Sequence, residues 1–275
     1  MKIDAHHHLW KYSETEYGWI DDTMAAIRRD FLPTDLRAAT AAAGIDRVIS
    51  VQARQSVEET EWLLELADGE ELIAGVVGWL PLVSADITGQ LDRFSGRAKL
   101  AGLRHVLQGE PEPGYMLRAD FNRGLAQLAD RGLAYDILVF EHQLPEVLQL
   151  VDRHPNQRFI LDHIAKPRIK ARELQPWLDR MRELARRPNV WCKLSGVVTE
   201  ADIHSWTEQE LSPYLEGALE AFGPRRLMFG SDWPVCLVAT GYADWAALAG
   251  RLVSRLSSSE QEAFWSGNAR EAYGL

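Results

Sequence analysis

Short apolar runs rich in β-branched residues alternate with longer amphipathic segments along the whole chain. Some of these runs, such as Val48–Val51 and Phe159–Leu161, are almost continuously apolar, as expected of strands that helices cover on both faces. The pattern predicts eight strands: Lys2–Ala5, Arg47–Gln52, Ile73–Leu80, Ala101–Leu107, Ala134–Phe140, Arg158–Ile164, Val190–Leu194 and Leu227–Ser231.

The segments between these runs carry the signals of helix ends. Ser56 with Glu59, and Thr207 with Glu210, form capping-box patterns ahead of helical sequences. Glycines follow several helical patterns, where a left-handed residue closes a helix. The predicted helices are Asp35–Ala43, Val57–Ala67, Asp120–Arg131, Gln143–Arg153, Glu173–Arg186, Leu211–Phe222, Tyr242–Leu256 and a last one that begins near Ser259 and is capped with Glu262.

Strand and helix alternate eight times without a low-complexity linker, which predicts one (β/α)₈ TIM barrel domain over residues 1–275. A doubly wound open sheet is the alternative. That fold normally has a glycine-rich phosphate loop after its first strand, whereas histidines follow the first strand here.

Composition narrows the classes of partner. Hydrophobic residues make up 46% and charged residues 25% of the chain, and no apolar run is long enough to span a bilayer. A soluble, cytoplasmic protein is therefore expected. The formal charge of −10 argues against nucleic acid and anionic membranes as partners. Cys192 and Cys236 form no CxxC pair and suggest neither a disulfide nor a zinc knuckle, and nothing indicates the oligomeric state.

His6 and His8 directly follow the first predicted strand. If the strand continues into them, alternation turns both imidazoles to one side and His7 to the other. Leu9 and Trp10 interrupt the run, which argues against an expression tag. Taken alone, the pair fits a cluster of histidines in a surface loop as well as it fits a site.

Other polar residues lie at the carboxyl ends of later strands, where TIM barrels place their catalytic groups. His163 ends the sixth strand and Asp232 follows the eighth. Each has a structural explanation when taken alone: a core histidine, and a turn residue before a proline. Together with His6 and His8, they supply three imidazoles and one carboxylate, which suit a divalent metal ion or a held water molecule.

Several motifs resemble those of the amidohydrolase superfamily. They are the His6-x-His8 pair, Leu161-Asp-His163, Gly230-Ser-Asp-Trp-Pro234 and Gly267-Asn-Ala-Arg270. Further segments look like its sugar-lactonase branch, which includes L-fuconolactonases, L-rhamnonolactonase-like enzymes and pyrone-dicarboxylate lactonases: Val51–Thr60, Gly75–Trp79, Gly102–Gln108, Asp162–Pro167, Cys192–Gly196 and Phe229–Cys236. The likeness covers essentially the whole chain and is greatest to the L-fuconolactonases.

The resemblance implies hydrolysis of a sugar lactone to its aldonic acid at the barrel mouth, as in fucose catabolism. By the same resemblance, Asp232 is the general base to water, His163, His6 and His8 polarise the carbonyl, and Arg104 orients the substrate. No lysine lies on the two central strands to bridge two metal ions. The resemblance leaves open whether no cofactor is needed or one divalent ion, with zinc as the first candidate, is held by the four clustered residues.

A sugar lactone needs hydrogen-bonding groups and flat apolar walls around it. The predicted polar contacts are Gln52, Arg54, Arg104, Asp136 and Lys193, and the predicted aromatic ones are Trp10, Trp19, Trp79 and Trp233. This mixed polarity favours a neutral polyol lactone over a dicarboxylate, which would need several convergent arginines. The alternatives are a metal-dependent decarboxylase of the same superfamily and a non-catalytic barrel that serves as a binding scaffold.

Overall fold

Eight parallel strands form the centre of the molecule, and the computed structural model describes all 275 residues. The strands are β1 (Ile3–His7), β2 (Arg47–Val51), β3 (Ile73–Gly78), β4 (Leu100–His105), β5 (Ala134–Ile137), β6 (Phe159–Leu161), β7 (Val190–Leu194) and β8 (Leu227–Phe229). All eight predicted strands are confirmed. β5 and β6 end three residues earlier than predicted, because the residues that follow leave the sheet and form the loops at the barrel mouth.

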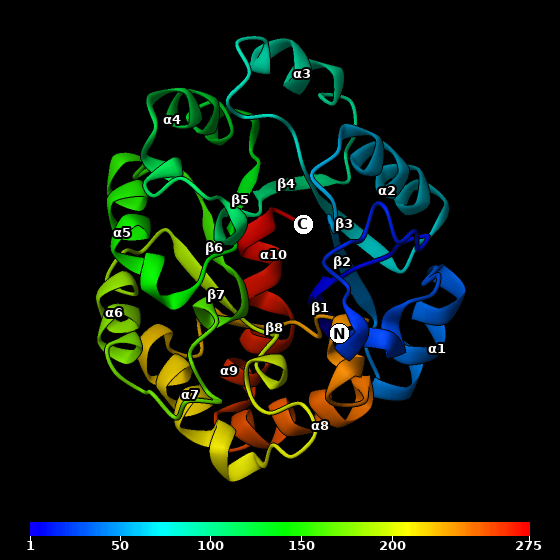
Figure 1. Ribbon diagram of the computed structural model, residues 1–275, viewed down its shortest axis with the longest axis vertical. Helices are drawn as coiled ribbons and strands as arrows, with labels where there is room; N and C mark the ends of the chain where they lie inside the picture. The colour runs from blue at the N-terminus through cyan, green and yellow to red at the C-terminus, as the bar shows by residue number, and fades with distance from the viewer.

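The strands are hydrogen-bonded in chain order from β1 to β8 (Figure 1). The segment after β8 returns to β1: the His8 amide donates to the Trp233 carbonyl at 2.6 Å, and the Asp232 amide donates to the His6 carbonyl at 2.8 Å. The result is a nearly closed barrel with helices outside it, which confirms the predicted (β/α)₈ TIM barrel fold. Closure brings the ends of β1 and β8 together, and with them their polar side chains.

Ten helices accompany the strands. They are α1 (Pro33–Ala43), α2 (Val57–Gly69), α3 (Ile87–Arg93), α4 (Ala119–Leu125), α5 (Leu144–Arg153), α6 (Trp177–Leu184), α7 (Glu208–Phe222), α8 (Tyr242–Val253), α9 (Ser258–Glu262) and α10 (Asn268–Tyr273). The short α3 was not predicted, since it buries only Ile87 and Leu91. The last capping box is formed by Ser257 with Glu260, two residues before the predicted pair. None of the helices has the length and apolar character needed to cross a bilayer.

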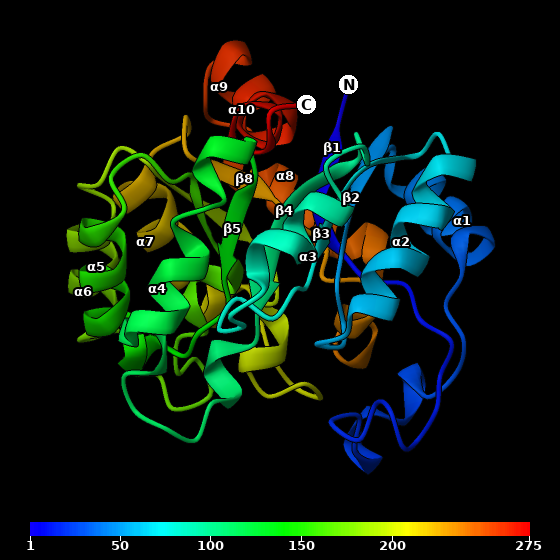
Figure 2. The same cartoon turned by 90° about the horizontal axis from the view of Figure 1, so that it is seen from above.

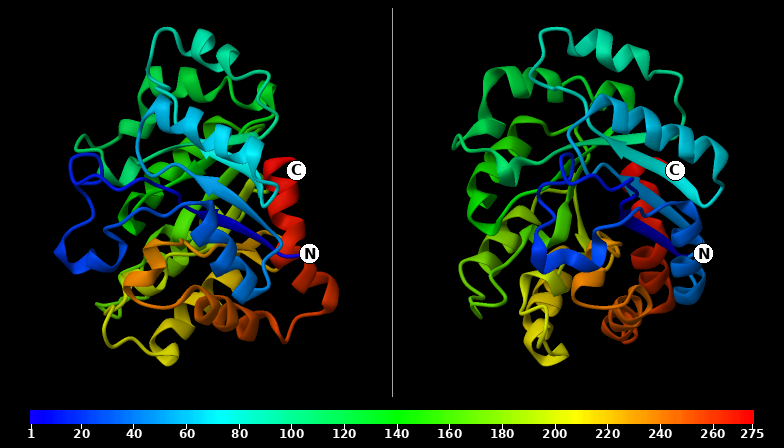
Figure 3. Two further views of the ribbon diagram at one scale, coloured as in Figure 1. Left: turned by 90° about the vertical axis from the view of Figure 1, so that its right-hand side faces the viewer. Right: turned by 45° about the vertical axis from the view of Figure 1, so that its right-hand side comes forward.

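The two ends of the barrel differ. α9 and α10 lie over the end where β1 begins, and both chain termini lie there too (Figures 2 and 3). Ala269, Ala272 and Tyr273 of α10 belong to a buried cluster with inward residues of all eight strands, such as Ile3 of β1. These side chains fill that end of the barrel. The long segment between β1 and α1 lies at the other end (Figure 2).

A register shift in β1 decides which histidines face inward. Ile3 and Ala5 face the barrel interior, so strict alternation would turn His7 inward as well. The pairing of β1 with β2 shifts between Asp4 and His7. His7 therefore faces outward, where its Nε2 lies 2.8 Å from the hydroxyl of Ser50. The predicted arrangement, with His6 and His8 on one side and His7 on the other, is present because of this shift.

Candidate active site

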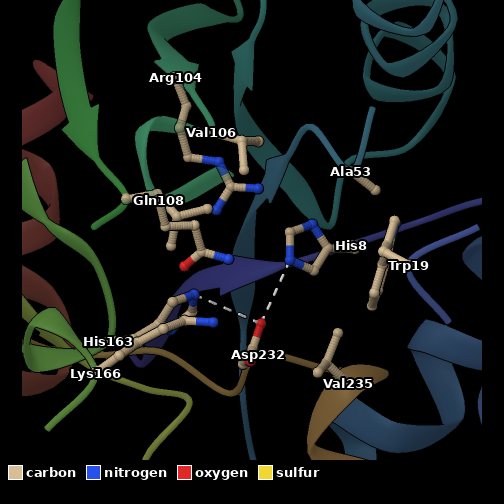
Figure 4. A pocket seen from close by; sticks show the side chains of 11 residues that line it. His8, Trp19, Ala53, Arg104, Val106, Gln108, His163, Lys166, Asp232 and Val235 are labelled. Carbon is tan, nitrogen blue, oxygen red and sulfur yellow. Dashed lines mark ion pairs between the residues drawn. The ribbon is translucent and has the colours of Figure 1, made fainter. Parts of the chain in front are cut away.

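Four side chains converge at the carboxyl ends of β1, β6 and β8. Asp232 Oδ1 lies 3.3 Å from His8 Nε2, 3.7 Å from His6 Nε2 and 3.9 Å from His163 Nε2. The Nε2 atoms of His6 and His8 are 3.3 Å apart. In the cluster of four that the sequence predicted, the three histidines therefore surround a carboxylate oxygen of the fourth residue, Asp232. Figure 4 shows His8, His163 and Asp232.

A hydrogen bond to the backbone fixes the orientation of His8. Its Nδ1 lies 2.8 Å from the carbonyl oxygen of Val51. A carbonyl only accepts, so neutral His8 carries its proton on Nδ1 and presents an unprotonated Nε2 to Asp232. Two acceptors at 3.3 Å repel each other. A cation or a shared proton between His8 and Asp232 would relieve this repulsion.

Two strained turns aim the other members of the cluster. Asp232 has a φ of +56°, and the four residues from His163 to Lys166 all have φ between +46° and +59°. Residues with side chains rarely adopt this region, at a cost of about 1–3 kcal/mol each, and such strain concentrates at functional sites. The left-handed turn after β6 directs both His163 and Lys166 into one pocket.

A network of buried charges supports the cluster from within the barrel. Asp162 pairs with Arg104 and with Lys193, each at 3.0 Å, and Lys193 also pairs with Asp136. Lys193 Nζ lies 3.2 Å from His6 Nδ1, which joins the network to the cluster. With Asp232, the network has three carboxylates but only two side-chain cations. One negative charge is left uncompensated when the histidines are neutral.

Burial sets the protonation states of the cluster. It lowers the pKa of His163 to about 4, and that of His6 well below its usual value, although nearby carboxylates oppose the effect. Burial would raise the pKa of Asp232, but His163, His8 and His6 together hold it below its usual range. At neutral pH the site therefore offers the ionised carboxylate of Asp232 beside the neutral imidazoles of His6 and His163, the form in which the carboxylate can accept a proton from water.

A pocket of about 220 Å³ opens onto the cluster, a size that suits one sugar ring. Its lining residues are His8, Trp19, Ala53, Arg104, Val106, Gln108, Leu138, His163, Lys166, Asp232 and Val235. In Figure 4, Arg104, Gln108, His163 and Lys166 form a polar side of this pocket, and Trp19 and Val235 lie across from them. The pocket therefore presents both hydrogen-bonding groups and an apolar wall.

The model of the amidohydrolase family matches residues 3–275 of this chain. The chain belongs to the amidohydrolase family. The predicted resemblance is confirmed, and it covers essentially the whole sequence.

Two curated relatives of this amidohydrolase are L-fucono-1,5-lactonases. The one from Burkholderia multivorans is 43% identical over 286 residues, covering all of this chain and 96% of the relative. The one from Burkholderia ambifaria is 36% identical, covering 90% of this chain and 85% of the relative. A solved structure of an amidohydrolase from Burkholderia multivorans with bound zinc is 43% identical, with a TM-score of 0.95 over 100% of this chain and 99% of that one.

The donor set of this amidohydrolase fits one zinc ion. Ligand atoms placed 2.0–2.1 Å from a tetrahedral zinc lie about 3.3–3.4 Å from one another. His6 Nε2, His8 Nε2 and Asp232 Oδ1 are 3.3–3.7 Å apart. A cation there would separate the facing acceptors of His8 and Asp232 and offset the extra negative charge. A second group of donors, His6 with Asp162 and His163, suits a metal less because Arg104 and Lys193 already pair with Asp162.

Of the predicted substrate contacts, Arg104 and Trp19 line the pocket of this amidohydrolase, but seven others do not: Gln52, Arg54, Asp136, Lys193, Trp10, Trp79 and Trp233. Asp136 and Lys193 are fully buried and pair beneath the cluster. Gln52 is also fully buried, and its backbone carbonyl and side-chain oxygen accept from Arg104. In the structure these three residues contact other buried side chains beneath the pocket.

Arg54 and three tryptophans pack elsewhere. Arg54 pairs with Glu16, in the segment after β1. Trp10 is fully buried, Trp233 packs edge-on against Phe31, and Trp79 donates to His105 on the outer side of β4. Trp19 is the one predicted tryptophan at the pocket, and its exposed fraction of 44% leaves its ring accessible.

The sequence analysis missed two polar groups of the pocket, Lys166 and Gln108, and the buried Asp162. The signal for Lys166 was its position three residues after His163, in the same loop. The signal for Gln108 was its position just beyond the fourth strand. Asp162 lies next to His163, but only the strained turn after β6 brings both side chains to the barrel interior.

Proposed function

We propose that this amidohydrolase hydrolyses a sugar lactone, with L-fucono-1,5-lactone as the first substrate to test, and releases the aldonic acid. The observation that carries the proposal is the convergence of three histidines, His6, His8 and His163, on the Asp232 carboxylate at a pocket of a sugar ring's size. The names of the two Burkholderia relatives support the same substrate class.

In this mechanism, the Asp232 carboxylate accepts a proton from the water that attacks the lactone carbonyl carbon. A new C–O bond forms and negative charge develops on the carbonyl oxygen. His163, whose Nδ1 lies 2.9 Å from the hydroxyl of Ser195, is oriented toward Asp232 and the pocket. Together with Arg104 on the polar side of the pocket, it stabilises this developing charge.

The ring opens when the bond from the carbonyl carbon to the ring oxygen breaks. Asp232 returns the proton to this oxygen, which becomes a hydroxyl group of the open chain. The aldonic acid then ionises at neutral pH, so each turnover releases one proton to solution. Asp232 therefore acts first as base and then as acid, and the site needs no second proton donor.

His6, His8 and Asp232 would hold one zinc ion, with His163 beside them. When bound, such an ion makes the carbonyl more electrophilic and the water more acidic. Lys193 and Asp162 lie behind Nδ1 of His6 and hold its ring in place from the opposite side. Groups that orient a ligating histidine in this way are common around metal sites.

A lactone panel with a pH indicator tests the proposal. The protein, purified with zinc, is given L-fucono-1,5-lactone, L-rhamnono-1,4-lactone and 2-pyrone-4,6-dicarboxylate, and then retested after chelation and after zinc is restored. We expect acid release from a sugar lactone and little from the dicarboxylate. The activity should be lost after chelation and should return when zinc is restored. Acid release from the dicarboxylate alone, or no acid from any sugar lactone, would overturn the proposal.

A further inference from the structure

Lys166 places a positive charge in the pocket that the proposed mechanism does not use. It lies on the polar side near His163, in the turn after β6 whose four residues all have positive φ. A strained turn of this kind persists only when its surroundings hold it. The turn therefore positions the side chain of Lys166 in the pocket as well as that of His163.

Glu200 holds this lysine in position. The Lys166 ammonium lies 3.7 Å from Glu200 Oε1, in the loop after β7, and 5.7 Å from the centre of the Phe140 ring. Burial raises the pKa of Glu200, and the lysine opposes that rise. A separation of 3.7 Å is longer than a hydrogen bond. The ammonium is therefore restrained electrostatically, while its N–H groups stay available to a ligand.

The position of Lys166 suits the ring hydroxyls better than the reacting carbonyl. His8, His163 and Asp232 already surround the place where the carbonyl must lie. The pairing with Glu200 draws the ammonium toward the β7 side of the mouth. A protonated lysine donates three hydrogen bonds, and hydroxyl oxygens accept them.

We propose that Lys166 is a specificity-determining residue that donates hydrogen bonds to the hydroxyl groups of the sugar lactone, with Glu200 as its positioning partner. The inference rests on the proposed lactonase function and names the part of the substrate that this side of the pocket recognises. It predicts that the enzyme distinguishes a hydroxylated lactone from a plain one mainly through Lys166.

The test compares Lys166→Met, Lys166→Arg and the control Lys170→Met, all with zinc bound. Lys170 lies in the same loop but is exposed and pairs with Asp202 outside the pocket. With L-fucono-1,5-lactone, Lys166→Met should raise KM about 10- to 100-fold, the range expected for a lost charged hydrogen bond. Its kcat should change by less than about threefold, because the lost contact binds ground state and transition state alike. Lys166→Arg should raise KM less than Lys166→Met does. Lys170→Met should have the KM and kcat of the wild type.

A second substrate separates recognition from catalysis. The second substrate is δ-valerolactone, a six-membered lactone without hydroxyl groups. On this substrate the rate of Lys166→Met should lie within about twofold of the wild-type rate. The inference is overturned if Lys166→Met leaves KM unchanged, if its loss is confined to kcat, or if its loss accompanies lost zinc or a lowered Tm. A wild-type protein that opens no sugar lactone would instead refute the proposed function itself.

Discussion

His8 shows how one hydrogen bond prepares a residue for its role. The Val51 carbonyl holds the proton of neutral His8 on Nδ1, so Nε2 faces Asp232 without a proton. The neighbouring His7 lies on the outer side of β1 against Ser50. The two adjacent histidines can therefore be compared directly, because His8 is proposed to bind zinc and His7 is not.

Replacement of each histidine tests this difference. His8→Ala should bind zinc at least about tenfold more weakly than the wild type, because a ligand is lost. His7→Gln keeps a polar group near Ser50 and should retain stoichiometric zinc. Metal analysis after dialysis against a weak chelator measures both variants. Equal zinc content in the two variants would contradict the proposed ligand set.

The convergence of His6, His8, His163 and Asp232 could be predicted because strand ends and alternation can be read from the sequence pattern. The depth of a side chain along the barrel cannot be read in this way. Asp136 and Lys193 do face inward, but they lie below the pocket and form a buried pair. Trp233 follows Asp232 directly, yet it packs on Phe31 because the closure of the barrel turns it outward.

The loop after β7 contacts the His163 ring and helps to orient it. Ser195 contacts Nδ1 of His163, and Gly196 follows with a φ of +61°. A side chain at Gly196 would begin 2.6 Å from the same Nδ1 atom. Glycine is therefore needed here both for the backbone conformation and for the close approach of the ring.

Gly196→Ala should displace His163 and strain the backbone. We expect a loss of about 1–3 kcal/mol in the free energy of unfolding and a fall of at least about tenfold in kcat/KM on the lactone. Denaturant unfolding and steady-state kinetics measure the two effects. The control is Gly109→Ala, whose added Cβ would meet Val106 at an ordinary 3.7 Å. A Gly196→Ala variant that behaves like this control would refute the role of the loop.

Elements were predictable where their signal is local. The capping residues of α2 and α7, Ser56 and Thr207, accept from the expected backbone amides. The left-handed turn at residues 163–166 gave no signal, because no glycine marks it. The packing around this turn imposes its conformation. The sequence therefore did not show that Lys166 would point into the pocket.

At the scale of the whole molecule, the C-terminal helix reaches the charge network beneath the site. The Tyr273 hydroxyl donates to Asp136 at 2.8 Å from the filled end of the barrel. Burial raises the pKa of Asp136 to about 6, against the effect of Lys193 and of this hydroxyl. The last residues of the chain therefore help to keep a carboxylate ionised inside the barrel, next to the lysine that contacts His6.

Tyr273→Phe removes one donor from this buried carboxylate and should destabilise the fold by about 1–3 kcal/mol. In a chain of this size, the Tm should fall by roughly 2–4 °C for each kcal/mol. The control Tyr12→Phe, in the segment after β1, should keep the wild-type Tm. Scanning calorimetry at pH 7 decides the matter, and an unchanged Tm for Tyr273→Phe would mean that α10 fills the barrel without supporting the network.

The most direct measurement is the rate of acid release from L-fucono-1,5-lactone by the wild-type protein and by Asp232→Asn, each supplied with zinc. The wild type should release one equivalent of acid for each lactone consumed. Asp232→Asn should be slower by about 10²–10⁴-fold, with a Tm within about 3 °C of the wild type. Near wild-type turnover by Asp232→Asn, or no acid above the spontaneous rate from the wild type, would contradict the proposed site and reaction.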